Sequence, residues 1–172
     1  TLDANHAEAY LDQGLTYMEL YEPGSEQPKD KEYAEGAIQS FKKYISLDPS
    51  SDKVREYLVN ICKLSNRLDD AIDLFTGDYN KDPNDVNLVR KLAVLNNMAG
   101  RTDKMIEWYE KAQTLDPANP ESAYSVGVAC WARSYNSPYM PQEIRMAVLD
   151  KGQIAFEKAL SLRKEYFEAF SF

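Results

Sequence analysis

The stretch from Leu115 to Glu121 reads Leu-Asp-Pro-Ala-Asn-Pro-Glu, and its first half recurs twice in the chain. Leu-Asp-Pro also occupies positions 47–49, and Lys-Asp-Pro occupies positions 81–83, so the three prolines are separated by 34 residues each time. Proline stops a helix because it has no N–H and its ring clashes with the preceding turn. An aspartate at this place favours the start of the next helix. The sequence therefore predicts one helix-to-helix turn, repeated at a fixed interval.

The segment before each proline has a regular skeleton, with a small or slender residue, an aromatic four positions later, and the proline eight positions after that. The copies are Ala37, Phe41 and Pro49; Ala71, Phe75 and Pro83; Met105, Tyr109 and Pro117; and Gly152, Phe156 and Lys164. A preceding helix should carry a large residue, a Leu-Gly pair and a tyrosine, and Tyr10, Gln13-Gly14 and Tyr17 are close to this pattern. The period and the skeleton resemble the tetratricopeptide repeat family over nearly the whole chain.

This resemblance implies an all-α fold, a solenoid of helical hairpins wound into an α-α superhelix with about four repeats. We place the repeats at residues 7–49, 52–83, 86–117 and 120–164, with insertions at 22–32 and 134–147. Residues 1–6 are expected to close a preceding repeat, and residues 167–172 to open a following one. The chain is therefore predicted to be part of a larger protein, and residues 134–172 are similar to bacterial repeat proteins.

The skeleton has a physical basis in helix packing. Small side chains at Gly14, Val59, Ala93 and Gly127 are expected to let the two helices of a hairpin approach closely. The aromatic rings should fill the space between one hairpin and the next. The first insertion is polar and is expected to form an exposed loop. In the second, Pro141 should open a lengthened helix that ends near Leu162. Whether either insertion has a function is left open.

Composition narrows the class of partner. The 172 residues carry a formal net charge of -8, which argues against binding to a nucleic-acid backbone or to an anionic membrane. No apolar run reaches the ~18 residues of a membrane span, so membrane insertion is not expected. We expect a soluble protein of the bacterial cytoplasm or periplasm, and the sequence does not distinguish between the two compartments.

Residues for catalysis or metal binding are scarce. The one histidine, His6, lies in the opening segment, so neither a Ser-His-Asp triad nor a histidine-ligated metal site is predicted. Cys62 and Cys130 occupy the same position two repeats apart and are expected to be buried small hydrophobic residues. The sequence therefore predicts no enzyme, no cofactor and no metal.

A binding surface remains. In the family, the first helices line a concave groove, and its exposed positions follow the large opening residue by one, five and eight. The residues predicted to bind a peptide there are Leu11, Leu15, Met18, Asn60, Lys63, Arg90, Asn97, Tyr124, Val128 and Trp131. The basic residues suggest a bound carboxylate, and the apolar ones suggest aromatic or aliphatic anchors. Alternatively, a further repeat upstream would simply cover the three residues of the first helix. The variant that clamps the carboxylate of heat-shock chaperones does not fit, since only Asn60 matches its pattern.

The predicted function is a scaffold that binds a peptide or a helix of a partner protein in the groove. Two alternatives stay open. The array would position a catalytic or regulatory region elsewhere in a longer chain, or it would self-associate through its ends or its groove.

Overall fold

The structure is a computed structural model that describes residues 2–25 and 27–169, and the side chains of residues 6–25 and 27–163. These residues form α-helices and connecting turns, without a strand. The helices are α1 (Leu2–Leu20), α2 (Pro28–Leu47), α3 (Asp52–Leu64), α4 (Leu68–Lys81), α5 (Val86–Met98), α6 (Thr102–Leu115), α7 (Pro120–Tyr135) and α8 (Gln142–Ala169). The all-α prediction is confirmed.

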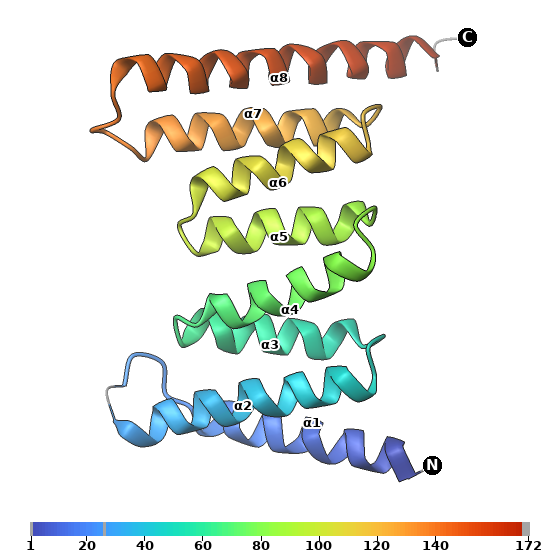
Figure 1. Cartoon of the computed structure of the whole chain (residues 1–172), viewed down its shortest axis with the longest axis vertical. Helices are drawn as coiled ribbons and strands as arrows, with labels where there is room; N and C mark the ends of the chain where they lie inside the picture. The colour runs from blue at the N-terminus through green and yellow to red at the C-terminus, as the bar shows by residue number, and fades with distance from the viewer. Residues whose placement is uncertain (1, 26, 170–172) are drawn as a thin grey trace. The chain divides into compact units, whose positions relative to one another are not determined.

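The chain divides into two compact units, Thr1–Leu74 and Phe75–Phe172, and the boundary falls inside α4. The first unit contains the hairpin α1–α2 and the helix α3, which packs on α2. In the second unit, α5, α6, α7 and α8 follow one another as neighbouring layers, with successive helices running in opposite directions (Figure 1). Each unit thus builds its own core, and each is described by itself below.

The first unit is organised around Phe41 of α2, which is completely buried. A Cβ atom on Gly14 of α1 would lie 2.5 Å from this ring, so only glycine allows α1 and α2 to approach as they do. On its other side, the ring of Phe41 lies 5.8 Å from that of Tyr57 on α3. The prediction for Gly14 is confirmed. The ring of Phe41, however, packs inside its own hairpin as well as against the next helix.

A group of charged side chains joins α2 to the first turn of α4 in the first unit. Asp70 accepts hydrogen bonds from Lys42 and Arg67, and Arg67 also pairs with Glu35. Burial by itself raises the pKa of the Asp70 carboxyl, but the hydrogen bond from Lys42 and the two nearby positive charges outweigh burial and lower it.

The second unit has a core between α6, α7 and α8. Its buried residues are Met105, Ile106, Val126, Ala129, Cys130 and Ala155, with Tyr109 and Val148 packed against them. Phe156 of α8 lies over Gly127 of α7, where a Cβ atom would lie 2.6 Å from the ring. Gly127 and Phe156 therefore repeat the arrangement of Gly14 and Phe41, with the aromatic ring inside its own hairpin.

The turns use aspartate in two ways. Asp48 and Asp82 each accept a hydrogen bond from the backbone N–H two residues further on, as predicted. Asp116 differs, because its carboxylate accepts from the side chains of Arg90 and Asn119. Asn119 then caps α7 by accepting from the backbone N–H of Glu121. The stretch with which we began is therefore a turn, as expected, but its aspartate joins helices and does not cap one.

The first insertion is shorter than predicted, because α2 already begins at Pro28. Asp30 is buried in the first turn of α2, where it accepts hydrogen bonds from the backbone of Glu22 and the hydroxyl of Ser25. These bonds fold the preceding loop onto the helix, and they explain why residues 28–32 are helical and not part of the loop. Residue 26 lies outside the described residues.

Both predicted repeat ends are helical in the structure. Residues 2–6, expected to close a preceding repeat, belong to α1. Ala4 stands where the other copies have proline, and alanine favours a helix. Residues 167–169, expected to open a following repeat, still belong to α8, and residues 170–172 lie outside the described residues. The assignment of these two segments to neighbouring repeats stays a prediction.

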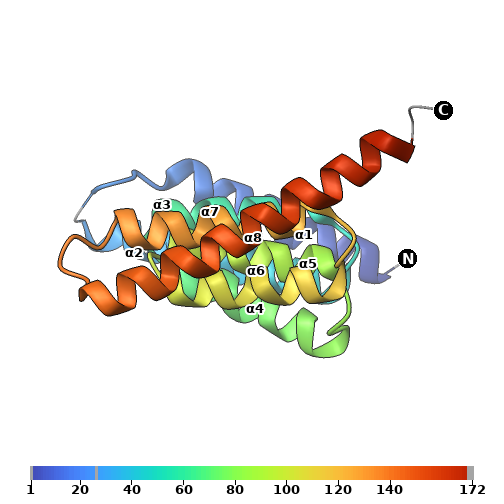
Figure 2. The ribbon, with the colours of Figure 1, turned by 90° about the horizontal axis from the view of Figure 1, so that it is seen from above.

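The second insertion lengthens helices, as predicted. α8 begins at Gln142, directly after Pro141, and its 28 residues make it much longer than the 16 residues of α7. The C-terminal part of α8 therefore runs on past α7 (Figure 2). Arg145 orders the turn between them by donating to the backbone oxygens of Ser134 and Ser137, both at 2.7 Å.

Candidate functional site

The exposed face of α7 carries three of the large side chains that the sequence selected. Tyr124 and Trp131 expose 51% and 55% of their surface, and Val128 lies between them and is exposed as well. The spacing of four and three residues keeps the three side chains on one face of the helix. The opposite face of α7 is buried, and Gly127 and Cys130 are part of it. We call Tyr124, Val128 and Trp131 the α7 patch.

The aromatic rings of the α7 patch have neighbours. Trp131 stacks on Tyr135 with the ring centroids 5.2 Å apart and the planes inclined by 13°. The ring of Tyr124 lies 5.7 Å from that of Phe156 on α8. Contacts between aromatic rings stabilise the positions of the two side chains, and they leave much of each ring exposed. The rings are therefore held in place while a large part of each remains open to a partner.

A shallow cleft of about 170 Å³ lies beside the α7 patch, between α5, α6 and α7. It is lined by Asn97, Met105, Tyr109, Tyr124, Ser125, Val128, Ala129 and Ala132. Three of the predicted binding residues, Asn97, Tyr124 and Val128, thus meet at one place. The amide of Asn97 supplies a donor and an acceptor at the edge of an otherwise largely apolar depression.

Arg90 is not the available cation that the sequence suggested. Its Nη2 donates to the Asp116 carboxylate at 3.0 Å and to the Ser122 hydroxyl at 2.8 Å. Both acceptors belong to the turn between α6 and α7 or to the first turn of α7, so Arg90 ties α5 to α7. Sequence reasoning missed this because Asp116 was assigned to capping the next helix. A role of Arg90 in binding a carboxylate stays a prediction, and it would have to be fulfilled beside the pair with Asp116.

The other predicted residues lie in the first unit. Leu11, Leu15 and Met18 share one face of α1 and are half-buried, whereas Asn60 and Lys63 are exposed on α3. These five residues therefore belong to a different compact unit from the α7 patch. Their role in binding stays a prediction.

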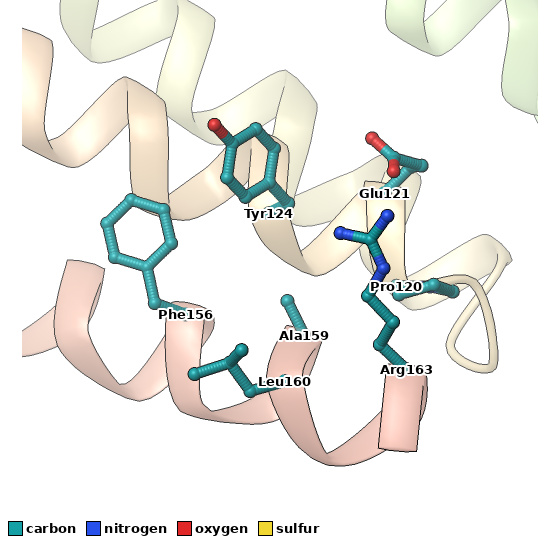
Figure 3. A pocket seen from close by; sticks show the side chains of 7 residues that line it. All are labelled: Pro120, Glu121, Tyr124, Phe156, Ala159, Leu160 and Arg163. Carbon is teal, nitrogen blue, oxygen red and sulfur yellow. The ribbon is translucent and has the colours of Figure 1, made fainter. Parts of the chain in front are cut away.

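A second and larger cleft was not found by sequence reasoning. It has a volume of about 510 Å³ and lies between the N-terminal half of α7 and the C-terminal half of α8. Figure 3 shows its lining, which consists of Pro120, Glu121, Tyr124, Phe156, Ala159, Leu160 and Arg163. Leu160 exposes 68% of its surface there. The sequence contained one signal for this cleft, which is the apolar Leu160 four positions after Phe156 on the lengthened helix.

Reactive groups are few among the described side chains. Cys62 and Cys130 are both free and buried, as predicted. Burial raises the pKa of the Cys62 thiol to about 12 and raises that of Cys130 as well, so both are protonated at neutral pH. Over the same described range, no group of three or more histidine, cysteine, aspartate or glutamate side chains could hold a metal ion. None of the described helices is long and apolar enough to cross a membrane.

Comparison with known proteins agrees with the repeat pattern. A tetratricopeptide repeat model matches residues 98–119, which include α6 and the turn that follows it. The chain has the tetratricopeptide repeat fold. Sequence comparison with curated proteins gives no significant match.

Solved structures share this tetratricopeptide fold. A crystal structure of MamA is 24% identical, with a TM-score of 0.57 over 97% of this chain and 84% of the MamA chain. A structure of MamA from residue 41 to its end, from Desulfovibrio magneticus RS-1, is 16% identical, with a TM-score of 0.53 over 92% of this chain and 76% of that one. At such identities the likeness shows the fold alone.

Proposed function

We propose that this chain is a protein-interaction scaffold, and that the α7 patch with its adjoining cleft binds a peptide or a helix of a partner protein. The observation that carries the proposal is the exposure of Tyr124, Val128 and Trp131 on one face of α7. A folded protein seldom leaves a contiguous apolar and aromatic surface open unless another molecule covers it. The tetratricopeptide fold supports this proposal, because stacked hairpins present extended surfaces to partners.

The α7 patch has the composition of an interface centre. Tyrosine and tryptophan are enriched among the residues that dominate binding energies, because they bury a large area and lose little conformational freedom. The support of Tyr124 by Phe156, and of Trp131 by Tyr135, lowers the entropy lost on binding further. Asn97 at the edge of the cleft offers hydrogen bonds to the backbone of a bound segment.

The chemistry of the bound segment follows from these contacts. The cleft of about 170 Å³ has room for one or two side chains, so the segment should present an aliphatic or aromatic anchor there. A carboxylate is not required by this proposal, since Arg90 already pairs with Asp116. The partner is therefore a protein segment with spaced apolar residues.

The proposal is tested with peptides selected from a displayed random library on the purified chain. The affinity of each selected peptide is measured by fluorescence anisotropy for the wild type, Trp131→Ala and Val128→Glu, with Lys43→Ala on α2 as the control. Trp131→Ala should weaken binding by about 2 kcal/mol, roughly thirtyfold, and Lys43→Ala should leave it unchanged. Thermal melts establish that the variants stay folded. If folded Trp131→Ala and Val128→Glu bind the peptides as well as the wild type does, the proposal is wrong.

A further inference from the structure

The helix α8 carries a row of five side chains at heptad spacing, of which four are apolar and one, Gln153, is polar. Met146, Gln153 and Leu160 are spaced by seven, and Leu149 and Phe156 follow the first two of them by three. This is the spacing with which one helix packs along another, where the two apolar positions of a heptad alternate by three and four. All five side chains are exposed or half-buried, and Met146 exposes 50% of its surface. We call these five residues the α8 stripe.

The α8 stripe adjoins the face by which α8 joins its unit, and Phe156 belongs to both, because its ring also packs on Gly127 of α7. The inner face contains Gly152, Ala155 and Ala159, which are buried, and Gly152 approaches Cys130 of α7. A helix at the surface of a globular protein ordinarily has one apolar face, directed at the core. The apolar surface of α8 continues beyond this face, since Met146 and Leu160 are exposed, and α8 is the outermost helix of the second unit in Figure 1.

The cleft beside the α8 stripe lies at a repeat position that a following helix occupies elsewhere in this chain. Phe156 holds the repeat position of Phe41, and in the first unit Tyr57 of the next helix packs on Phe41 at 5.8 Å. In front of Phe156 lies the cleft of about 510 Å³, whose wall on the α8 side includes Leu160 (Figure 3). A helix is therefore the element that fits, as α3 fits its own neighbour.

The charges beside the α8 stripe indicate the charge that a bound partner helix should carry. Glu143, Asp150 and Glu157 are also spaced by seven and are all exposed, and the last two directly follow stripe residues. They form an acidic row along the solvent side of the stripe, and Gln153 donates to Glu157 at 2.8 Å. Such flanking positions select a partner helix by opposite charge. Arg163 is the basic side chain at the cleft, and it lies at the end near Glu121 (Figure 3).

We propose that the α8 stripe and the cleft between α7 and α8 bind an amphipathic helix of a partner protein that carries lysine or arginine beside its apolar residues. A second copy of this chain fits poorly on the stripe. Antiparallel pairing of two α8 helices would place the acidic row against itself. Parallel pairing would place the acidic row of each helix against the opposite flank of the other, and that flank contains the buried Gly152 and Ala159. The site is separate from the surface between α5 and α7, and it shares only Tyr124 with it.

The test uses two synthetic helical peptides about three heptads long, with leucine at both apolar positions. One carries lysine at the flanking positions, and the other carries glutamate there. Binding of each labelled peptide is measured by fluorescence anisotropy at low and moderate salt. The wild type should bind the lysine peptide and not the glutamate peptide, and added salt should weaken binding. Leu160→Glu should weaken it about tenfold or more, whereas Val128→Glu on the other surface should leave it unchanged.

A pair of charge reversals separates recognition from general attraction to an acidic protein. Asp150→Lys with Glu157→Lys should weaken binding of the lysine peptide about tenfold or more and should create binding of the glutamate peptide. Asp12→Lys with Glu19→Lys on α1 changes the net charge equally and should have an effect of about twofold or less. Equal effects of the two pairs, or no binding of the lysine peptide, would overturn the proposal. So would a concentration-dependent dimer, seen by light scattering, that Leu160→Glu abolishes.

Discussion

Replacing Gly127 by alanine tests the closest approach between two helices in the second unit. A Cβ atom at this position would lie 2.6 Å from two carbon atoms of the Phe156 ring and 2.9 Å from a third. Distances below about 3.0 Å do not occur between such atoms in folded proteins, so the ring or the helix must move. Gly77 on α4 is the matched control, because a Cβ atom there would have no neighbour within 4 Å.

The expected free energies of unfolding follow from two terms of opposite sign. Alanine gains about 1 kcal/mol over glycine in helix propensity at either position. At Gly127, overpacking against Phe156 costs about 1–3 kcal/mol. Gly77→Ala should therefore stabilise the protein by up to about 1 kcal/mol, and Gly127→Ala should destabilise it by about 0–2 kcal/mol. The difference between the two variants is the cost of overpacking itself.

Urea unfolding followed by circular dichroism measures both variants against the wild type. A double variant that adds Phe156→Leu should recover part of the loss at Gly127, because leucine leaves more room beside the new methyl group. Equal stability of Gly127→Ala and Gly77→Ala would refute the reasoning, since α7 and α8 would then not approach through this glycine.

Three further predictions concern stability and reactivity. Phe75→Ala should cost about 3–5 kcal/mol of unfolding free energy in urea titrations, because the ring is buried and its removal leaves a cavity. Cys62 and Cys130 should react with iodoacetamide slowly in the native protein and rapidly in urea, since burial raises the pKa of both thiols; rapid native labelling, detected by mass spectrometry, would contradict their burial. The pKa of Asp70 is lowered in the folded state, so its contribution is complete at neutral pH and is lost as the pH falls below about 5. Asp70→Asn should flatten this acid limb in unfolding curves recorded at several pH values, and an unchanged slope would contradict the role of its bonds to Lys42.

The sequence by itself determined the repeating elements of this protein. The interval of 34 residues located the turns, and the small and aromatic residues marked the helices between them. These features are readable because they depend on neighbours at fixed separations along the chain, such as the residue before a proline or the next turn of a helix. The burial of Cys62 and Cys130 and the exposure of the α7 patch follow from the same periodicity.

Only the tertiary structure decided which side chains are available to a partner. Arg90 occupies a groove position in the repeat pattern, yet its guanidinium pairs with the carboxylate of Asp116, which is 26 residues away. The helix α2 begins as early as Pro28, because the buried carboxylate of Asp30 in its first turn accepts hydrogen bonds from the loop before it. Leu160 lines a cleft although it lies outside the buried face of α8, because Phe156 and Tyr124 form the adjoining wall. A periodic pattern specifies the face of a helix on which a residue lies, but the partner it meets there depends on how the other helices pack, and that packing is set by contacts between residues far apart in the chain.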